Sequence, residues 1–148
     1  MHTIGFRRPG SAVILFLTVF LLGLLVAVGC QPTGPQVATL KATDFAFTPN
    51  NVNLKVGQVV QLSIQNDGAV DHDLKSEIPI ASLTYQQADN PLDEQQENIA
   101  KAALDIDYGV GHKGQVSFVP KQAGSYTFFC DVAGHREAGM QGMFVVAN

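Results

Sequence analysis

The sequence predicts an all-β domain, a sandwich or barrel, with one short helical insertion. Several short segments after residue 37 alternate strictly between apolar and polar residues, and Gly, Asn and Asp mark their ends. This period of two is typical of strands with one buried face. Between about residues 81 and 111 the alternation is lost and Gln, Asp, Glu and Ala accumulate, which indicates the insertion.

The first 29 residues have the layout of an export signal. Arg7 and Arg8 precede an uncharged, mostly apolar run over residues 12–28, and small residues lead up to Cys30. A cysteine at this boundary resembles the bacterial lipobox, in which cleavage leaves a lipidated N-terminal cysteine. The alternative is an uncleaved membrane anchor, although the run is shorter than the ~20 residues of a spanning helix.

Both alternatives place the rest of the chain outside the cytoplasm. We expect residues 30–36 to be a linker and residues 37–148 to form a domain held at the membrane, in the periplasm or on the outer face of the cell membrane. Removal of 29 of the 148 residues leaves 119, which is enough for one hydrophobic core, so we expect one domain.

The two cysteines have different expected roles. Lipidation of Cys30 would leave Cys130 without a disulfide partner, and an odd thiol in an oxidising compartment needs burial or a bound metal. A disulfide between Cys30 and Cys130 is the competing interpretation. We disfavour this disulfide because it would tie the linker to the middle of a histidine-containing loop.

The charge balance argues against a nucleic-acid partner. The chain has 13 Asp and Glu against 9 Lys and Arg, and two of the basic residues, Arg7 and Arg8, lie in the export signal. Seven basic residues therefore remain against thirteen acidic ones, a net charge near −6 for the exported part. We expect an acidic, solvated surface.

Alternation predicts the strands in order along the domain. They lie around residues 45–47, 52–56, 60–64, 116–118 and 126–128, with an apolar closing strand over 143–146. Asn66, Asp67 and Gly68 mark a turn, so we expect His72 to enter from the strand that follows it.

A helix is predicted near residues 91–104. Asn90 is expected at the N-cap and Pro91 in the first turn, and the acidic residues that follow favour the positive end of a helix. The residues expected to face the core are Leu92, Ile99, Ala103 and Leu104. We expect this helix to cap one edge of the sandwich, with a partner-docking surface as the alternative.

Four residues form a candidate metal-ligand set: His72, Cys130, His135 and Met140. Three of them lie on one short loop after an apolar run, so a single coordination sphere can collect them at a small loop-closure cost. One thiolate and two imidazoles with a weak axial thioether are the donors of electron-transferring copper centres.

This pattern resembles the cupredoxin family, the type 1 blue copper proteins that include plastocyanin and azurin. The resemblance covers about residues 37–146 and includes the Asp44-Phe-Ala-Phe-Thr-Pro49 segment, Asn66 and the Cys-x4-His-x4-Met loop. It implies a Greek-key β-sandwich and one copper that cycles between Cu(I) and Cu(II). The implied equatorial ligands are His72, Cys130 and His135, with Met140 axial, and the spacing looks closest to auracyanin and rusticyanin.

Two residues depart from the family pattern. The family often has Asn after the first histidine ligand and Ser or Thr after the cysteine, whereas this chain has Asp73 and Asp131. We expect the two carboxylates to approach each other, which raises the pKa of one of them. The alternative is that both point into solvent or pair with Lys75 and Arg136.

The resemblance implies an electron carrier without catalytic residues. Its partners would be a redox protein donor and acceptor bound to the membrane, and we expect a monomer. An enzyme of the copper nitrite reductase type would need further histidine ligands and a second domain. The alternative is an extracytoplasmic copper carrier or store, because the same ligands can bind copper without transferring electrons.

Overall fold

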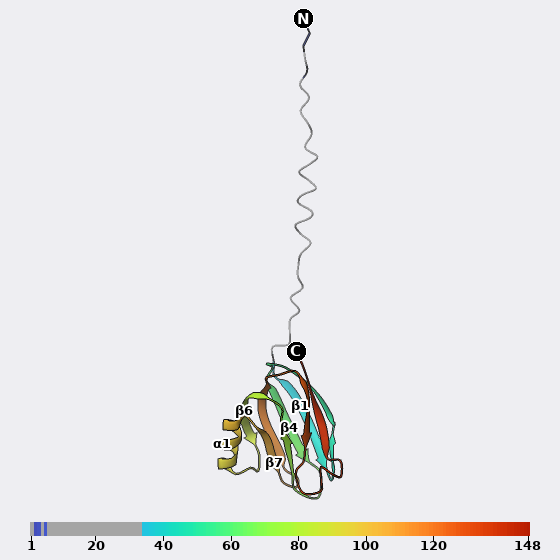
Figure 1. Ribbon diagram of the computed structural model, residues 1–148, viewed down its shortest axis with the longest axis vertical. Helices are drawn as coiled ribbons and strands as arrows, with labels where there is room; N and C mark the ends of the chain where they lie inside the picture. Colours follow the sequence, from blue (N-terminus) through green and yellow to red (C-terminus); the bar gives the residue numbers. More distant parts are fainter. Residues whose placement is uncertain (1, 4, 6–33) are drawn as a thin grey trace. The chain divides into compact units, whose positions relative to one another are not determined.

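The computed structural model describes residues 34–148, together with residues 2, 3 and 5. Gly34–Asn148 form one compact unit (Figure 1). The predicted export signal or anchor, the lipidation site at Cys30 and the first part of the linker lie outside the described residues. Within those residues, no helix has both the length and the apolar character needed to cross a membrane.

The unit is an all-β sandwich of two five-stranded sheets, which confirms the predicted fold class. The first sheet has the order β2 (Ala46–Thr48), β1 (Gln36–Thr43), β4 (Val60–Asn66), β8 (Lys113–Pro120), β6 (Ile80–Gln87). The second has the order β3 (Asn51–Lys55), β10 (Gln141–Ala147), β9 (Gly124–Phe129), β5 (His72–Ser76), β7 (Leu104–Tyr108). Many neighbouring strands are not consecutive in the chain, as expected of Greek-key connections.

The core lies between the two sheets and follows from the alternation in the sequence. In β1 and β4 every second residue is buried, so each strand buries one face and exposes the other. Phe128 is central to the aromatic part of this core, with ring centroids 4.6 Å from Phe144 and 5.3 Å from Phe47. Burial of each such ring contributes about 1.5–3 kcal/mol, and these contacts make β9 a rigid support for the residue that follows it.

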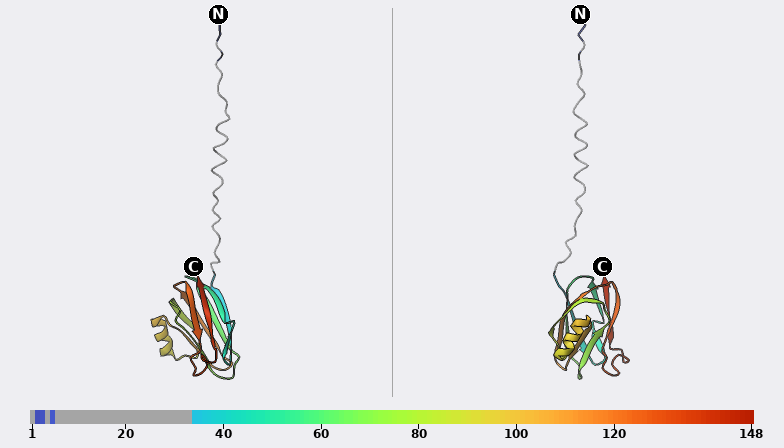
Figure 2. Two further views of the ribbon diagram at one scale, coloured as in Figure 1. Left: turned by 45° about the vertical axis from the view of Figure 1, so that its right-hand side comes forward. Right: turned by 60° about the vertical axis from the view of Figure 1, so that its left-hand side comes forward.

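The helix is present but differs in detail from the prediction. It spans α1 (Leu92–Lys101), with Pro91 at the N-cap position and no side-chain cap. Asn90 instead accepts a hydrogen bond from the backbone N–H of Asp107, so its predicted capping role is wrong. Figure 2 shows α1 on the outside of the sandwich, where it contacts β6.

The expected core face of the helix is also wrong. Leu92 is 76% exposed and Ile99 is 45% exposed, whereas the buried helical residue is Asn98. Leu104 is buried, but as the first residue of β7. Two strands, β6 and β7, flank the helix within the stretch of residues 81–111 for which no strand was specified.

Candidate metal centre

The predicted ligands come together at one end of the sandwich. His72 is the first residue of β5, and Cys130 follows the last residue of β9. β5 and β9 are antiparallel, with Lys75 opposite Phe129, so the first residues of β5 extend past the end of β9 and lie beside the residues that follow Phe129. We use the name ligand loop for residues 130–140, which join β9 to β10.

Backbone hydrogen bonds hold the ligand loop closed. The N–H of Cys130 donates to the carbonyl of Met140 over 3.1 Å, and the N–H of Met140 donates to the carbonyl of His135 over 2.9 Å. Gly134 and Gly139 have φ values of +84° and +105°, which residues other than glycine rarely adopt. The loop thereby returns Met140, which is fully buried, to the end of the strand that carries Cys130.

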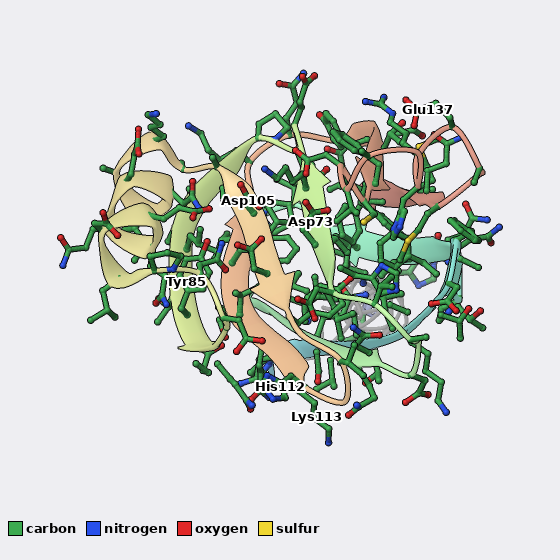
Figure 3. All side chains as sticks on the ribbon, turned by 90° about the horizontal axis from the view of Figure 1, so that it is seen from below. Asp73, Tyr85, Asp105, His112, Lys113 and Glu137 are labelled. Carbon is green, nitrogen blue, oxygen red and sulfur yellow. The ribbon has the colours of Figure 1, made fainter. Side chains whose placement is uncertain are left out.

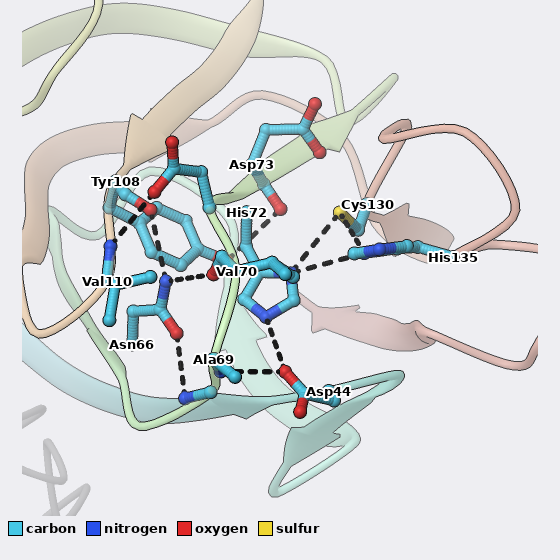
Figure 4. Close-up of polar contacts among 12 residues, drawn as sticks. Asp44, Asn66, Ala69, Val70, His72, Asp73, Tyr108, Val110, Cys130 and His135 are labelled. Atoms are coloured by element: carbon cyan, nitrogen blue, oxygen red, sulfur yellow. Dashed lines mark hydrogen bonds and ion pairs between the residues drawn. The ribbon is translucent and has the colours of Figure 1, made fainter.

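Three donor atoms converge in a small, buried space (Figure 4). Nδ1 of His72 lies 3.2 Å from Nδ1 of His135, and Sγ of Cys130 lies 3.9 Å and 3.5 Å from these two nitrogens. Cys130 is a free thiol, and all three side chains are buried. Two imidazole nitrogens and one sulfur aimed at a common point are the donors that a copper or zinc ion uses.

Burial shapes the ionisation of these ligands. It raises the pKa of the Cys130 thiol to about 11. The metal-free protein therefore holds a neutral thiol at neutral pH, and a metal that binds there must displace its proton. Burial, and after it the charge of His135, lowers the pKa of His72, which keeps that imidazole neutral and able to act as a ligand.

Asp73 and Asp131 lie close together beside the centre. The carboxylate of Asp73 accepts a hydrogen bond of 2.7 Å from the backbone N–H of Asp131, which ties β5 to the ligand loop. The Asp131 carboxylate pairs with Lys75 at 2.9 Å. Burial raises the pKa of Asp73, while the interaction with Asp73, followed by that with Lys75, lowers the pKa of Asp131. The guanidinium of Arg136 packs over the ring of Phe129 at 3.9 Å.

Two neighbours of the histidines were missed by sequence reasoning. Asp44 places Oδ1 at 3.9 Å from Nε2 of His72, and Phe45 sets its ring edge-on to His135, with centroids 5.1 Å apart and planes at 75°. Both residues belong to the 44–49 segment quoted for the family resemblance. No alternation or ligand spacing in that segment connects it with residues 72 and 135, so the sequence carried no signal for these contacts.

Asn66 fixes the turn that leads to His72. Its side-chain amide donates to the carbonyl of Val70 over 2.8 Å and its Oδ1 accepts from the N–H of Gly68 over 2.9 Å. These bonds connect the end of β4 to the start of β5 and limit the movement of His72.

A second group of possible metal ligands lies away from this centre. Oxygens of Glu94, Asp105 and Asp107 lie within 4.8 Å of one another, and Lys75 already pairs with Asp105 at 3.2 Å. Figure 3 shows Asp105 near Tyr85 on the helix side of the molecule, while Glu137 lies on the ligand loop at the other side. In the part of the chain that the structure describes, the thiolate–imidazole group alone has the donors expected for copper.

Comparisons with known proteins agree with the copper-type donors of this site. A family model described as copper binding proteins, plastocyanin/azurin family, matches residues 36–147. The copper-resistant cuproprotein CopI of Rubrivivax gelatinosus is 24% identical over 110 residues, which are 74% of this chain and 65% of that protein. The match thus spans slightly less than two thirds of the length of that relative.

Solved structures that share the fold include two copper proteins of different size. Auracyanin A of Chloroflexus aurantiacus, described as a "blue" copper protein, aligns over 77% of this chain and 100% of its own, with a TM-score of 0.55 and 21% identity. A multicopper oxidase of Campylobacter jejuni aligns over 78% of this chain and 30% of its own, with a TM-score of 0.55 and 11% identity. The fold therefore occurs both in small copper proteins and in larger copper enzymes.

Proposed function

The chain belongs to the plastocyanin/azurin family of copper-binding proteins, and on that premise we propose that it carries single electrons through one type 1 copper centre. The observation that supports this most directly is the convergence of His72 Nδ1, His135 Nδ1 and Cys130 Sγ within 3.2–3.9 Å in a buried site. Copper held there by His72, Cys130, His135 and Met140 would supply one-electron chemistry between Cu(I) and Cu(II).

The residues around the site support electron transfer because they resist rearrangement. The hydrogen bonds of the ligand loop, the β5–β9 pairing and the bond from Asp131 to Asp73 hold the three donors from different elements. A site that keeps one geometry in both oxidation states exchanges electrons with little reorganisation. The three donors are buried, which limits the access of a substrate to copper held there, so we propose a carrier and not an enzyme, although a multicopper oxidase shares the fold.

The location and partners of the protein are part of the same proposal. The pattern of residues 1–30 supports export and attachment to the membrane through lipid on Cys30 or through an uncleaved anchor. A domain held there would exchange electrons with a membrane-bound redox protein donor and acceptor. The excess of acidic over basic residues favours partners with a basic docking face.

Copper carriage or storage is the second candidate, because the relative from Rubrivivax gelatinosus is described as a copper-resistant cuproprotein. Repeated reduction and reoxidation in the presence of a Cu(I)-specific chelator separates the two functions. We expect the visible band to bleach and return over many cycles while copper stays bound. Transfer of copper to the chelator in the first reduction would instead identify a carrier.

A further inference from the structure

His72 has one ring nitrogen that the ligand set does not use. Its Nδ1 faces His135 and Cys130, whereas its Nε2 is buried without a hydrogen-bond partner. A buried polar atom without a partner is unusual in a folded protein. The carboxylate of Asp44 faces this atom, with Oδ1 at 3.9 Å (Figure 4).

Asp44 is itself held in place. Its Oδ1 accepts a hydrogen bond of 2.9 Å from the backbone N–H of Ala69, in the turn that leads to His72. Asp44 thus links the β1–β2 turn to the segment that carries the histidine. The separation from His72 is roughly 1 Å longer than a hydrogen bond, so a small shift of either side chain would close it.

Gly68 keeps the path between these two atoms open. A Cβ at this position would lie 2.7 Å from Oδ1 of Asp44 and 2.8 Å from Nε2 of His72, which is closer than atoms can approach. Any side chain there would separate the carboxylate from the imidazole. Glycine at position 68 therefore allows the two groups to interact directly.

We propose that Asp44 is a positioning residue that holds His72 in the tautomer with its proton on Nε2, so that Nδ1 presents a lone pair to the metal centre. The physical reason is electrostatic. A carboxylate oxygen attracts an N–H group and repels a ring nitrogen lone pair, and the complete burial of the His72 side chain strengthens both effects, while the Asp44 side chain is about half-exposed. A carboxylate on the distal nitrogen of a histidine ligand is a recurrent way to fix tautomer and ring orientation.

The proposal also assigns the donor and the acceptor in the contact between the two histidines. In the metal-free protein, Nδ1 of His72 must then accept the hydrogen bond and Nδ1 of His135 must donate it, across the 3.2 Å that separates them. The inference rests on the proposed function only for the identity of the metal, because the tautomer of the metal-free protein can be measured by itself.

The test uses the full-length chain in detergent micelles, labelled with ¹⁵N and free of metal. Long-range ¹H–¹⁵N spectra report which nitrogen of each histidine carries the proton. We expect His72 to be protonated on Nε2 in the wild type and to shift by at least several fold toward the Nδ1-protonated form in Asp44→Ala. Asp44→Asn keeps an acceptor oxygen and should retain most of the wild-type preference.

Copper affinity, measured by competition with a chelator, provides the second readout. We expect Asp44→Ala to weaken binding by about tenfold or more. Asp67→Ala removes a carboxylate from the turn that leads to His72, where it pairs with Lys41 at 3.3 Å, and serves as the charge-matched control, for which we expect no effect. An unchanged tautomer in Asp44→Ala, or equal effects of both alanine variants, would overturn the proposal. If the wild type bound no copper, the proposed function would fail while the tautomer measurement still decided the role of Asp44.

Discussion

Phe45 combines an unusual backbone with a position over the metal centre. Its φ is +68°, which is uncommon for a residue with a side chain, and its ring packs on His135 while remaining 49% exposed. A strained backbone persists where the surrounding structure imposes it. Here the strain places an apolar ring between His135 and solvent.

Removal of this ring should make copper easier to extract. We expect Phe45→Ala to speed copper loss to an external chelator by about tenfold, because His135 gains access to water. Its free energy of unfolding should change by less than about 1 kcal/mol, since the ring is half-exposed and the backbone strain is unaffected. Phe45→Tyr keeps the ring and is the matched control; equal release rates in all three proteins would contradict the shielding role.

We expect the ionised carboxylate of Asp107 to lower the free energy of unfolding at neutral pH. Burial, followed by the charges of Asp105 and Glu94, raises its pKa to about 6. The folded protein therefore binds a proton that the unfolded chain releases near pH 4, and this stabilisation is lost as the pH rises from about 4 to about 6. Asp107→Asn removes the ionisable group, so this variant should exceed the wild type in stability at pH 7.

The expected gain for Asp107→Asn is about 1 kcal/mol, since the group is only partly buried and solvent screens its charge. Urea denaturation at pH 4 and pH 7 measures it, with the difference expected mainly at pH 7. Glu137→Gln removes the same charge from an exposed position on the ligand loop and is the control. A gain of equal size at both pH values would show that the ionisation of Asp107 is not the cause.

At the scale of elements, the ligand loop depends on glycine at two positions. An added Cβ at Gly134 or Gly139 would meet no atom within 4 Å, so the cost of a side chain there comes from the backbone alone. A substitution at either position therefore tests the cost of the backbone conformation without a change in side-chain packing.

Gly134→Ala should lower the free energy of unfolding of the metal-free protein by about 1 kcal/mol, as expected for a positive φ. Gly134→Asn should cost less, because asparagine tolerates the left-handed region better than alanine does. Chemical denaturation of the two variants beside the wild type measures both values. Equal stability of the alanine variant and the wild type would mean that the loop adopts another conformation.

Most strands that bury one face over several residues were predicted, but β7 was missed because its first residue, Leu104, was assigned to the helix. β4 and β8 follow the alternation in the sequence closely, and the prediction that His72 enters from the strand after the turn at residues 66–68 is confirmed. β6 was missed because it lies at a sheet edge, with shifts in register against β8 and a broken burial pattern. The helix contacts β6 with few apolar residues, so its amphipathic pattern did not predict its buried face.

The candidate metal ligands could be selected from the sequence because three of them are close together in it and their chemistry is distinctive. The contacts of Asp44 and Phe45 were not, because they arise only when the β1–β2 turn reaches residues 72 and 135 across the fold. Sequence spacing therefore identified residues that converge in the structure, while the contacts of Asp44 and Phe45 with the two histidines required the structure.

At the scale of the whole molecule, negative charge gathers beside the metal centre. The described unit has a net charge near −6, and a pocket next to His72 is lined by four carboxylates. These are Asp71, Asp73, Asp89 and Asp107. Such a surface attracts cations and repels anions over about a Debye length.

The rates of electron exchange with small charged redox reagents should reveal this negative charge. We expect the rate of electron exchange with a cationic metal complex to fall as ionic strength rises, and the rate with an anionic complex to increase. Stopped-flow kinetics measures both rates between about 10 mM and 500 mM salt. The Debye length changes most over roughly this range of salt concentration. The same salt dependence for both reagents would show that the charge does not act at the site of electron transfer.

The most direct test of the account is the visible absorption spectrum of residues 31–148 loaded with Cu(II), before and after ascorbate, beside the Cys130→Ser variant. We predict an intense blue or green thiolate-to-copper band that bleaches on reduction, returns on reoxidation and is absent from the variant. A colourless or weakly coloured wild-type complex would mean that Cys130 is not an equatorial ligand, and would contradict the electron-transfer function.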